Sequence, residues 1–371
     1  MAPNTHTGLI LVTGVDRPGI AKSIFEVLAP FSIEIMDIEQ LVIRDRLILT
    51  VLIKSDPAHS GAIESDLVNF ANKNDIDIAA DFSSIHPEKM QNENLKKVLI
   101  LSENLKPNAF SKIVSAINGN VERINRIKSS PLTIIEIAYK GTFERLPIQA
   151  DADALALPEN FGNHARKLVV LDVDSTLIEQ EAIELLAVHA GVRDKVKEIT
   201  ARAMNGELDF AQSLTERVSL LAGLPEEVIS TVRGEITLSP GAENLISKLI
   251  ERGHGVGVVS GGFIEIIKPL IDDLKIKHYR ANSLEIENGK LTGKINGPII
   301  DRTAKANSLK DFAQIEAIPL DATIAVGDGA NDLEMIETAG YGIAYRAKPK
   351  VQERADGVMN TRYLDSILYL I

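Results

Sequence analysis

Three short apolar runs, each followed by a loop of Asp, Ser or Gly, constrain the fold of the C-terminal half. They span residues 167–171, 256–259 and 323–326. Helical patterns separate the runs, and strands that alternate with helices are typical of a parallel sheet covered on both faces. Ligands of such sheets bind at the carboxyl ends of the strands. The sequence therefore predicts an α/β domain over 165–371, with a doubly wound parallel sheet and a site at those loops.

More helix lies between the first two runs than one crossover requires. The segments near 179–190, 193–204, 210–221 and 226–234 have helical patterns. We expect them to form a helical cap at about 179–236, inserted over the site. Farther along, Asn288-Gly289 stands between two alternating stretches and is a strong signal for a β-hairpin.

The N-terminal half has a different pattern. Over residues 1–88 the order strand, helix, two strands, helix and strand predicts a ferredoxin-like α+β domain. A similar pattern over 95–160 indicates an internal repeat. The offset is 86 residues in each of the pairs Ile24/Phe110, Val27/Ile113, Ile35/Val121, Ile38/Ile124 and Leu41/Ile127. Because 143–161 is rich in Pro and Ala and weakly periodic, we expect this second domain to be truncated, without its last helix and strand.

The bulk composition limits the classes of partner. The 371 residues include 40 Lys and Arg, 52 Asp and Glu and no Cys, with a formal net charge of −12. An acidic excess gives no electrostatic reason to bind nucleic acid or an anionic membrane. The lack of Cys excludes disulfides and suits a reducing compartment, and no apolar run approaches the roughly 18 residues of a membrane span. We expect a cytoplasmic protein.

Two carboxylates follow the first apolar run. In the sequence LVVLDVDSTL, Asp172 and Asp174 lie two residues apart where a buried strand ends, so both can face the same way. Alone, the motif fits a turn or a helix cap as well as catalysis. The other loops favour catalysis, because each could hold part of a phosphate ester.

The remaining loops offer ligands for phosphate and for a cation. Ser260-Gly261-Gly262 supplies a hydroxyl and backbone donors that suit phosphate oxygens. The third run is followed by GDGAND at 327–332, whose acidic side chains suit a hard cation with oxygen ligands. Lys305 lies before that run and could neutralise a phosphate, although Lys294 and Lys310 are rivals.

From Lys167 onward, these four elements in this order resemble the haloacid dehalogenase superfamily of phosphohydrolases. The resemblance implies that Asp172 is a nucleophile that forms a phospho-aspartyl intermediate. Asp174 would serve as acid and then as base, which favours hydrolysis over the ATPase branch, where Thr stands at that place. It also implies Mg²⁺ bound by Asp172, Asp328 and the backbone carbonyl of Asp174.

The same resemblance implies a phosphate-binding set made of Ser260, the Gly261 N–H, Lys305 and Asn331. In the expected cap, Glu181 nine positions after Asp172, together with Arg217, brings the resemblance closer to phosphoserine phosphatases. Glu181 would pair with a substrate ammonium and Arg217 with a carboxylate. Met204 and Phe210 would be apolar contacts of the substrate. All four could equally be ordinary solvated or packing residues of the cap.

The N-terminal domain resembles an ACT regulatory domain, a class that commonly binds amino acids. Asp16-Arg17-Pro18-Gly19-Ile20 stands between its first strand and helix. Asp16 and Gly19 are the candidate ligand residues, because Gly admits a ligand to the backbone and a helix N-terminus attracts a carboxylate. A well-made N-cap explains the motif equally well. The implied regulatory ligand is an amino acid such as L-serine.

The second domain has S-E-N-L-K-P at 102–107 in place of that motif, so packing or dimerisation is its expected role. Because sheet edges of such domains often pair between chains, we expect a homodimer. The implied reaction is hydrolysis of phosphoserine in the last step of serine biosynthesis. The alternatives are action on another small phosphomonoester, such as phosphothreonine or phosphohomoserine, and a serine-sensing regulatory protein with vestigial catalysis.

Overall fold

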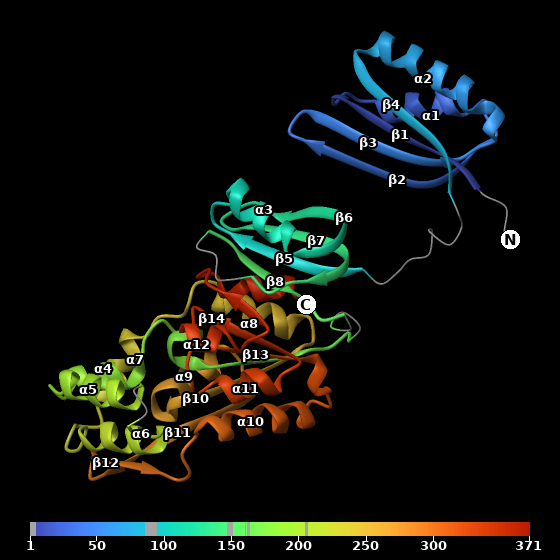
Figure 1. Ribbon diagram of the computed structural model, residues 1–371. Helices are drawn as coiled ribbons and strands as arrows, with labels where there is room; N and C mark the ends of the chain where they lie inside the picture. Colours follow the sequence, from blue (N-terminus) through green and yellow to red (C-terminus); the bar gives the residue numbers. More distant parts are fainter. Residues whose placement is uncertain (1–4, 86–94, 147–150, 160, 162–163, 205–206) are drawn as a thin grey trace. The chain divides into compact units, whose positions relative to one another are not determined.

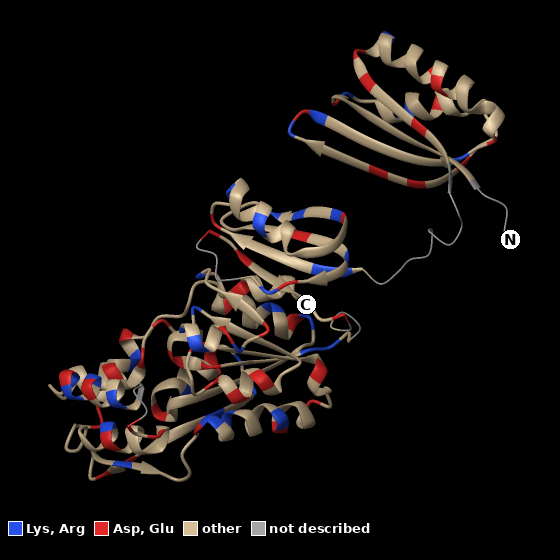
Figure 2. Ribbon diagram, in the orientation of Figure 1, with Lys and Arg blue, Asp and Glu red and all other residues tan. Residues whose placement is uncertain are grey.

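The computed structural model describes residues 5–85, 95–146, 151–159, 161, 164–204 and 207–371. They belong to two compact units, Met1–Glu93 and Asn94–Ile371 (Figure 1). Over the described residues, none of the helices has the length and apolar character needed to cross a bilayer. Lys and Arg lie among Asp and Glu on the described elements, as on helix α5 (Arg193–Met204) (Figure 2).

The first unit is a ferredoxin-like domain with an antiparallel sheet of order β2-β3-β1-β4. Alternate residues of the inner strands, including Ile10 and Val51, are buried against Ile24 of the first helix. All six predicted elements are present. In chain order they are β1 (Thr5–Val15), α1 (Ile20–Leu28), β2 (Glu34–Ile43), β3 (Arg46–Lys54), α2 (Ser60–Asn74) and β4 (Ile76–Ile85), and a short 3-10 turn, η1 (Pro57–His59), precedes α2.

The second unit begins with a copy of this sheet, of order β6-β7-β5-β8. Its elements are β5 (Lys96–Ser102), α3 (Pro107–Ser115), β6 (Ile117–Lys128), β7 (Thr133–Phe143) and β8 (Asp153–Ala156). The repeat extends to strand register. In β2, Ile35 pairs with Ile53 before a bulge, and in β6, Val121 pairs with Tyr139 before a bulge. Both members of the second pair lie 86 residues after those of the first, which confirms the repeat.

One expectation for the second copy is wrong, because its last strand is present. Strand β8 pairs with β5 at the edge that β4 occupies in the first copy. It has only four residues, two of them Ala, so neither length nor apolar alternation marked it as a strand. Between β7 and β8, the described residues 144–146 and 151–152 contain no helix. Strand β6 begins at Ile117, two residues after helix α3 ends at Ser115.

The rest of the second unit is built on a seven-stranded sheet of order β12-β11-β10-β9-β13-β14-β15, parallel except for β12. The three predicted apolar runs are its central strands β9 (Leu168–Leu171), β10 (Gly255–Phe263) and β13 (Thr323–Gly327). The other strands are β11 (His278–Glu287), β12 (Lys290–Asn296), β14 (Tyr341–Tyr345) and β15 (Gly357–Met359). The predicted hairpin joins β11 to β12, where Asn288 and Gly289 have φ values of 53° and 73°.

Helices cover both faces of this sheet, as in a doubly wound fold. Leu168 and Val170 of β9 pack in one apolar core with Phe312, and Val169 and Leu171 in another with Leu249. Burial on both faces explains why strand β9 itself has no polar residue. The covering helices are α8 (Ala242–Glu251), α9 (Ile264–Asp273), α10 (Arg302–Ile315), α11 (Leu333–Thr338) and α12 (Pro349–Gln352), with short 3-10 turns η5 (Leu320–Ala322) and η6 (Leu364–Tyr369).

The predicted cap is present as four helices between β9 and β10. They are α4 (Ala182–His189), α5, α6 (Phe210–Ser219) and α7 (Val228–Glu235), grouped at one end of the sheet in Figure 1. The two linkers to the cap meet at a bridge between Ile178 and Leu238. A second contact joins them, because the Thr237 N–H donates to Gln180 Oε1 at 2.9 Å. The cap is therefore attached through a narrow paired neck.

The second ferredoxin-like sheet packs on this parallel-sheet domain. Leu99 and Leu155, on the face away from helix α3, share an apolar core with Tyr341, Met359 and Leu364. Their neighbours Val98 and Ile100 point to the other face, where they pack with α3. Alternation along β5 thus joins one copy of the repeat to the parallel sheet.

Candidate active site

The turn η4 (Val173–Leu177) after β9 brings two carboxylates together. The Asp172 N–H donates to Val326 O at 2.9 Å, which ties this end of β9 to β13. Ser175 has a left-handed φ of 57°, so the chain folds back on itself. Asp174 then accepts hydrogen bonds from the Ala182 N–H at 2.8 Å and from Ser260 Oγ at 2.9 Å. Both Asp side chains are buried and fixed in direction.

The Ser-Gly-Gly loop after the second run contacts both the cap and the turn that carries Asp174. Ser260 Oγ accepts from the Gly262 N–H at 2.7 Å while it donates to Asp174. A Cβ atom at Gly262 would lie 2.6 Å from Asp174 Oδ2, and one at Gly261 would lie 3.0 Å from Phe210 Cζ. A side chain at Gly262 would therefore force Asp174 to shift, and one at Gly261 would press on the Phe210 ring.

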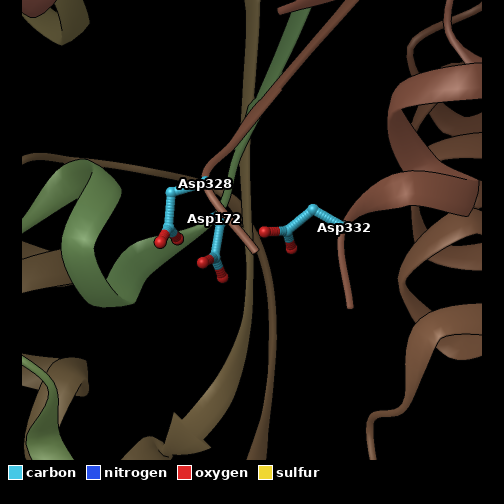
Figure 3. A group of neighbouring side chains, drawn as sticks. All are labelled: Asp172, Asp328 and Asp332. Carbon is cyan, nitrogen blue, oxygen red and sulfur yellow. The ribbon is translucent and has the colours of Figure 1, made fainter. Parts of the chain in front are cut away.

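Three carboxylates converge beneath this loop. Asp172, Asp328 and Asp332 come from the ends of β9 and β13 and from the start of α11, with ligand oxygens within 4.8 Å of one another (Figure 3). Lys305 Nζ lies 2.5 Å from Asp172 Oδ1 and 2.6 Å from Asp332 Oδ1. Lys305 is fully buried, whereas Lys294 and Lys310 are exposed. Of the three rival lysines, Lys305 is the one that reaches Asp172.

Asp332 is a residue that the predicted metal set omitted. It is fully buried, and its Oδ2 accepts from the Gly329 N–H at 2.9 Å. Figure 3 shows its carboxylate directed towards Asp172. In the sequence the residue was part of the acidic loop, but its place before a helix is also typical of an N-cap. Its inward direction depends on tertiary contacts with Lys305.

The charges of this cluster are unbalanced. Three carboxylates meet one ammonium group, which leaves two negative charges if all are ionised. Burial and Asp332 raise the pKa of Asp172 against the opposing effect of Lys305, and burial and Asp332 raise the pKa of Asp328 to about 7. Burial alone would lower the pKa of Lys305, but Asp172 and Asp332 outweigh it and raise that pKa. Oxygen donors with surplus negative charge fit a hard divalent cation.

A cavity of about 690 Å³ opens between this cluster and the cap. Fully buried Ser260 and Lys305 lie beneath it, against Asp174 and Asp172. Met204 is the last residue of α5, and its side chain falls outside the described part of the chain. Eight of the predicted site residues line the cavity, namely Asp172, Asp174, Glu181, Phe210, Arg217, Gly261, Asp328 and Asn331.

The cap end of the cavity carries opposite charges. Glu181 accepts a hydrogen bond from Ser175 Oγ at 2.8 Å. Its side chain is accessible from the cavity, but the surrounding walls and Asp174 raise the pKa of Glu181 to about 7. Arg217 is half-buried on α6, where its Nε donates to Ser213 O at 3.2 Å. An acid and a guanidinium in one cavity can receive the ammonium and the carboxylate of a zwitterion.

A further cation of the cavity was not predicted. Lys348 follows β14 and lines the cavity with Asp328 and Asn331. Its N–H donates to Asp328 O at 3.4 Å. A single lysine near the C-terminus has no motif around it, so no sequence signal could have found it.

The predicted regulatory residues lie in the first unit. Gly19 is the N-cap of α1 with a left-handed φ of 95°, and a Cβ there would have no atom within 4 Å. Asp16 is exposed, and its N–H donates to Asp45 O at 2.7 Å. The start of α1 is thus open above a glycine, as a ligand that approaches the backbone would need.

Comparison with known proteins gives two families. Residues 169–337 match the haloacid dehalogenase-like hydrolases and residues 6–81 match the ACT domain. A phosphoserine phosphatase of Streptomyces coelicolor is 41% identical over 377 residues, covering 98% of this chain and 92% of that protein. A solved phospho-aspartyl intermediate analogue of phosphoserine phosphatase matches with 45% identity and a TM-score of 0.53, over 56% of this chain and 99% of that one.

A substrate-bound phosphoserine phosphatase complex matches similarly, with 44% identity and a TM-score of 0.53 over 56% of this chain and 98% of that one. The fold of the solved relatives agrees with the parallel sheet found here, and the match to the Streptomyces protein extends over almost the whole length of both chains. The chain therefore belongs to the phosphoserine phosphatases of the haloacid dehalogenase-like hydrolases, with an ACT domain in its N-terminal half.

Proposed function

We propose that this chain hydrolyses O-phospho-L-serine to L-serine and phosphate through a phospho-aspartyl intermediate. The observation that carries the proposal is one cavity that joins two kinds of group. At one end lie Asp172, Asp174 and Asp328, and at the other lie Glu181 and Arg217. A phosphate ester of an amino acid needs both ends at once, whereas a simple phosphomonoester needs only the first.

Asp172 is the proposed nucleophile. Its oxygen attacks phosphorus while the bond from phosphorus to the serine oxygen breaks, and Asp174 gives its proton to that departing oxygen. In the second step Asp174 takes a proton from the water that attacks the acyl phosphate, which frees Asp172. The contacts of Asp174 with Ala182 and Ser260 keep its carboxyl group directed for both transfers.

Substrate binding divides between the two ends of the cavity. The Gly261 N–H, Ser260, Lys305 and Asn331 are proposed to hold phosphoryl oxygens. Gly261 and Asn331 line the cavity with Asp172, and Lys305 contacts Asp172, which supports this proposal. Glu181 is proposed to bind the ammonium and Arg217 the carboxylate. Phe210, which lies against Gly261, would cover the substrate from the cap, and Met204 keeps that role as a prediction.

Asp172, Asp328, Asp332 and the backbone carbonyl of Asp174 are proposed to hold Mg²⁺. The all-oxygen donor set and its excess negative charge support this choice. When bound, the ion neutralises charge as an anionic nucleophile meets an anionic phosphate. Lys305 orients Asp172 towards the substrate through the 2.5 Å contact.

Steady-state hydrolysis with and without Mg²⁺ tests the chemistry. Asp172→Asn should lose activity by at least about 10³-fold, because an amide cannot form the acyl phosphate. Arg217→Ala should raise KM for phosphoserine. It should leave hydrolysis of p-nitrophenyl phosphate nearly unchanged, because that substrate has no carboxylate for Arg217 to bind. Full magnesium-dependent turnover by Asp172→Asn would refute the covalent mechanism. Equal losses on both substrates for Arg217→Ala would favour another phosphomonoester as the natural substrate.

Regulation and assembly belong to the same proposal. L-serine is the proposed ligand at Asp16 and Gly19. The N-terminus of α1 in this ACT domain is open to a carboxylate, and binding of the reaction product there would allow feedback on activity. A homodimer is proposed through strand edges, since β2 and β6 end their sheets and expose apolar side chains such as Ile38 and Ile124. The cytoplasm remains the proposed location.

A further inference from the structure

Lys348 is held at the cavity by a very short helix. Its N–H donates to Asp328 O, and its carbonyl accepts from the N–H groups of Val351 and Gln352 at 2.9 and 3.1 Å in α12. A helix of four residues has too few internal hydrogen bonds to be stable alone. The position of the Lys348 cation therefore depends on what anchors α12.

Gln352, at the far end of α12, is the anchored residue. Its side chain is buried, and its Nε2 donates to Ala347 O at 2.7 Å and to Asn360 Oδ1 at 3.1 Å. The first bond closes the loop that carries Lys348. The second ties the helix to the segment after β15.

Two residues of the second ferredoxin-like domain support Gln352 or its partner Asn360. Arg145, after β7, donates from its guanidinium to Gln352 O. Asp153 of β8 accepts from the Asn360 N–H at 2.7 Å, from Asn360 Nδ2 at 2.9 Å and from the Thr361 N–H at 2.9 Å. Two residues of this domain thus converge on Gln352, one directly and one through Asn360.

The first copy of the domain has an aspartate at the equivalent position, but it lacks the buried contacts of Asp153. Asp77 pairs with Thr13 of β1 as Asp153 pairs with Leu101 of β5, so the two aspartates hold equivalent places. Asp77 is exposed, whereas Asp153 is buried with three N–H donors. A buried carboxylate is unfavourable unless its contacts compensate it.

We propose that Arg145 and Asp153 are positioning residues for the phosphatase reaction, which place the Lys348 cation at the phosphoryl end of the cavity through Gln352. The inference rests on the proposed function, because the cation serves to meet an anionic phosphoryl group. The competing explanation is that both residues only hold two domains together. The two explanations predict different results when Lys348 is removed. A positioning role acts through the Lys348 side chain, whereas a purely structural role does not depend on it.

A double-mutant cycle with Lys348→Ala separates them. Arg145→Ala removes an exposed side chain, so the fold should survive. In Asp153→Asn the new amide cannot accept all three hydrogen bonds. Either N–H groups of Asn360 and Thr361 lose their acceptor, or the Asn360 amide turns over and its contact with Gln352 is lost.

Each variant should lower kcat/KM for phosphoserine about three- to tenfold and weaken binding of inorganic phosphate, measured by calorimetry with Mg²⁺, by a similar factor. In the Lys348→Ala background neither change should have more than about a 1.5-fold effect. Thermal unfolding of each variant checks that it is folded. The matched controls are Asp77→Asn in the first copy and Lys106→Ala, which removes an exposed cation that pairs with Asp151; both should keep wild-type values.

Equal effects of Arg145→Ala with and without the Lys348 side chain would overturn the proposal and leave a purely structural contact. So would wild-type phosphate affinity and turnover in Arg145→Ala. If the wild-type chain binds phosphate but does not hydrolyse phosphoserine, the proposed function fails, and the phosphate-binding cycle still decides the role of Arg145 and Asp153.

Discussion

The two ferredoxin-like copies share strand order and a bulge at the same place, yet their open sheet faces differ. Leu11 pairs with Thr50 and Ala79, and Leu99 takes the same place in the second copy, between Glu136 and Leu155. Leu11 is 39% exposed, whereas Leu99 is 1% exposed because the parallel-sheet domain covers it.

This difference shows how one fold serves two purposes in a chain. In the second copy this sheet face packs on the parallel-sheet domain, and in that contact the buried Asp153 accepts hydrogen bonds from N–H groups. The first copy keeps an exposed face and a left-handed glycine at the start of its helix. The helix start of the second copy instead has Lys106 in an extended conformation. The second copy is thus attached to the parallel-sheet domain, whereas the first keeps the open helix start at which we propose a regulatory ligand.

The largest expected effect is on stability, at the equivalent positions Leu99 and Leu11 of the two sheet faces. Leu99→Asp should destabilise the second unit by about 3–5 kcal/mol, because it places a charge in an apolar core. Leu11→Asp, at the equivalent exposed place, should change the free energy of unfolding by less than about 1 kcal/mol. Denaturant unfolding followed by circular dichroism measures both. Similar losses for the two variants would mean that the open face of the first copy is covered in solution.

The second prediction concerns the helix starts. Gly19→Ala should cost about 1–2 kcal/mol for its left-handed φ, and its methyl group would stand where a ligand meets the backbone. The L-serine concentration for a half-maximal effect on activity should rise about tenfold, which corresponds to 1.4 kcal/mol. Lys106→Ala, at the matching N-cap, should leave this concentration unchanged. An unaltered serine response in Gly19→Ala would place the regulatory site elsewhere.

Much of this architecture could be predicted because it is encoded locally. Most residues of β9, β10 and β13 are apolar or Gly because both faces of the sheet are buried, and such runs are visible in the sequence. The start of α6 is marked by a capping box between Asp209 and Gln212. The Ser-Gly-Gly loop is visible as a motif directly after the second apolar run, although the neighbours that crowd its glycines, Asp174 and Phe210, come from distant segments.

What could not be predicted depends on contacts between distant segments. Strand β8 is too short and too rich in Ala to be marked, and it forms only because β5 offers an edge. The inward direction of Asp332 depends on Lys305, 27 residues earlier. The burial of Asp153 depends on Asn360, 207 residues later. Hydrophobic periodicity in the sequence cannot reveal such pairs, because each of these polar residues alone has the character of a surface residue.

A smaller effect, on dimerisation, is expected at the edge strands, which expose an isoleucine in both copies. Ile38 and Ile124 are 48% and 50% exposed on the edge strands β2 and β6. Ile38→Lys and Ile124→Lys should each raise the dissociation constant of the proposed homodimer by about three- to fivefold, because a charge on a strand edge opposes pairing. Light scattering over a dilution series measures it. A monomeric wild-type chain at all concentrations would contradict the dimer, and an effect of only one substitution would assign the interface to that copy.

The smallest effect sharpens the comparison between Asp153 and Asp77. Burial raises the pKa of Asp153, although hydrogen bonds from Thr361 and Asn360 oppose the shift. The folded chain therefore binds this proton more readily than the unfolded chain. The resulting stabilisation is fully present below the unfolded value near 3.9 and is lost as the pH rises through the raised folded value.

Asp153→Asn removes this proton linkage. The wild-type free energy of unfolding, relative to that of Asp153→Asn, should therefore increase as the pH falls from 7 to 4.5. Asp77→Asn, at the exposed equivalent place, supplies the baseline for the same measurement by denaturant unfolding. If the wild type instead loses stability relative to Asp153→Asn on acidification, the ionised carboxylate and its three N–H donors stabilise the contact more than burial opposes it, and Asp153 would then be a net stabilising link between the second copy and the catalytic domain.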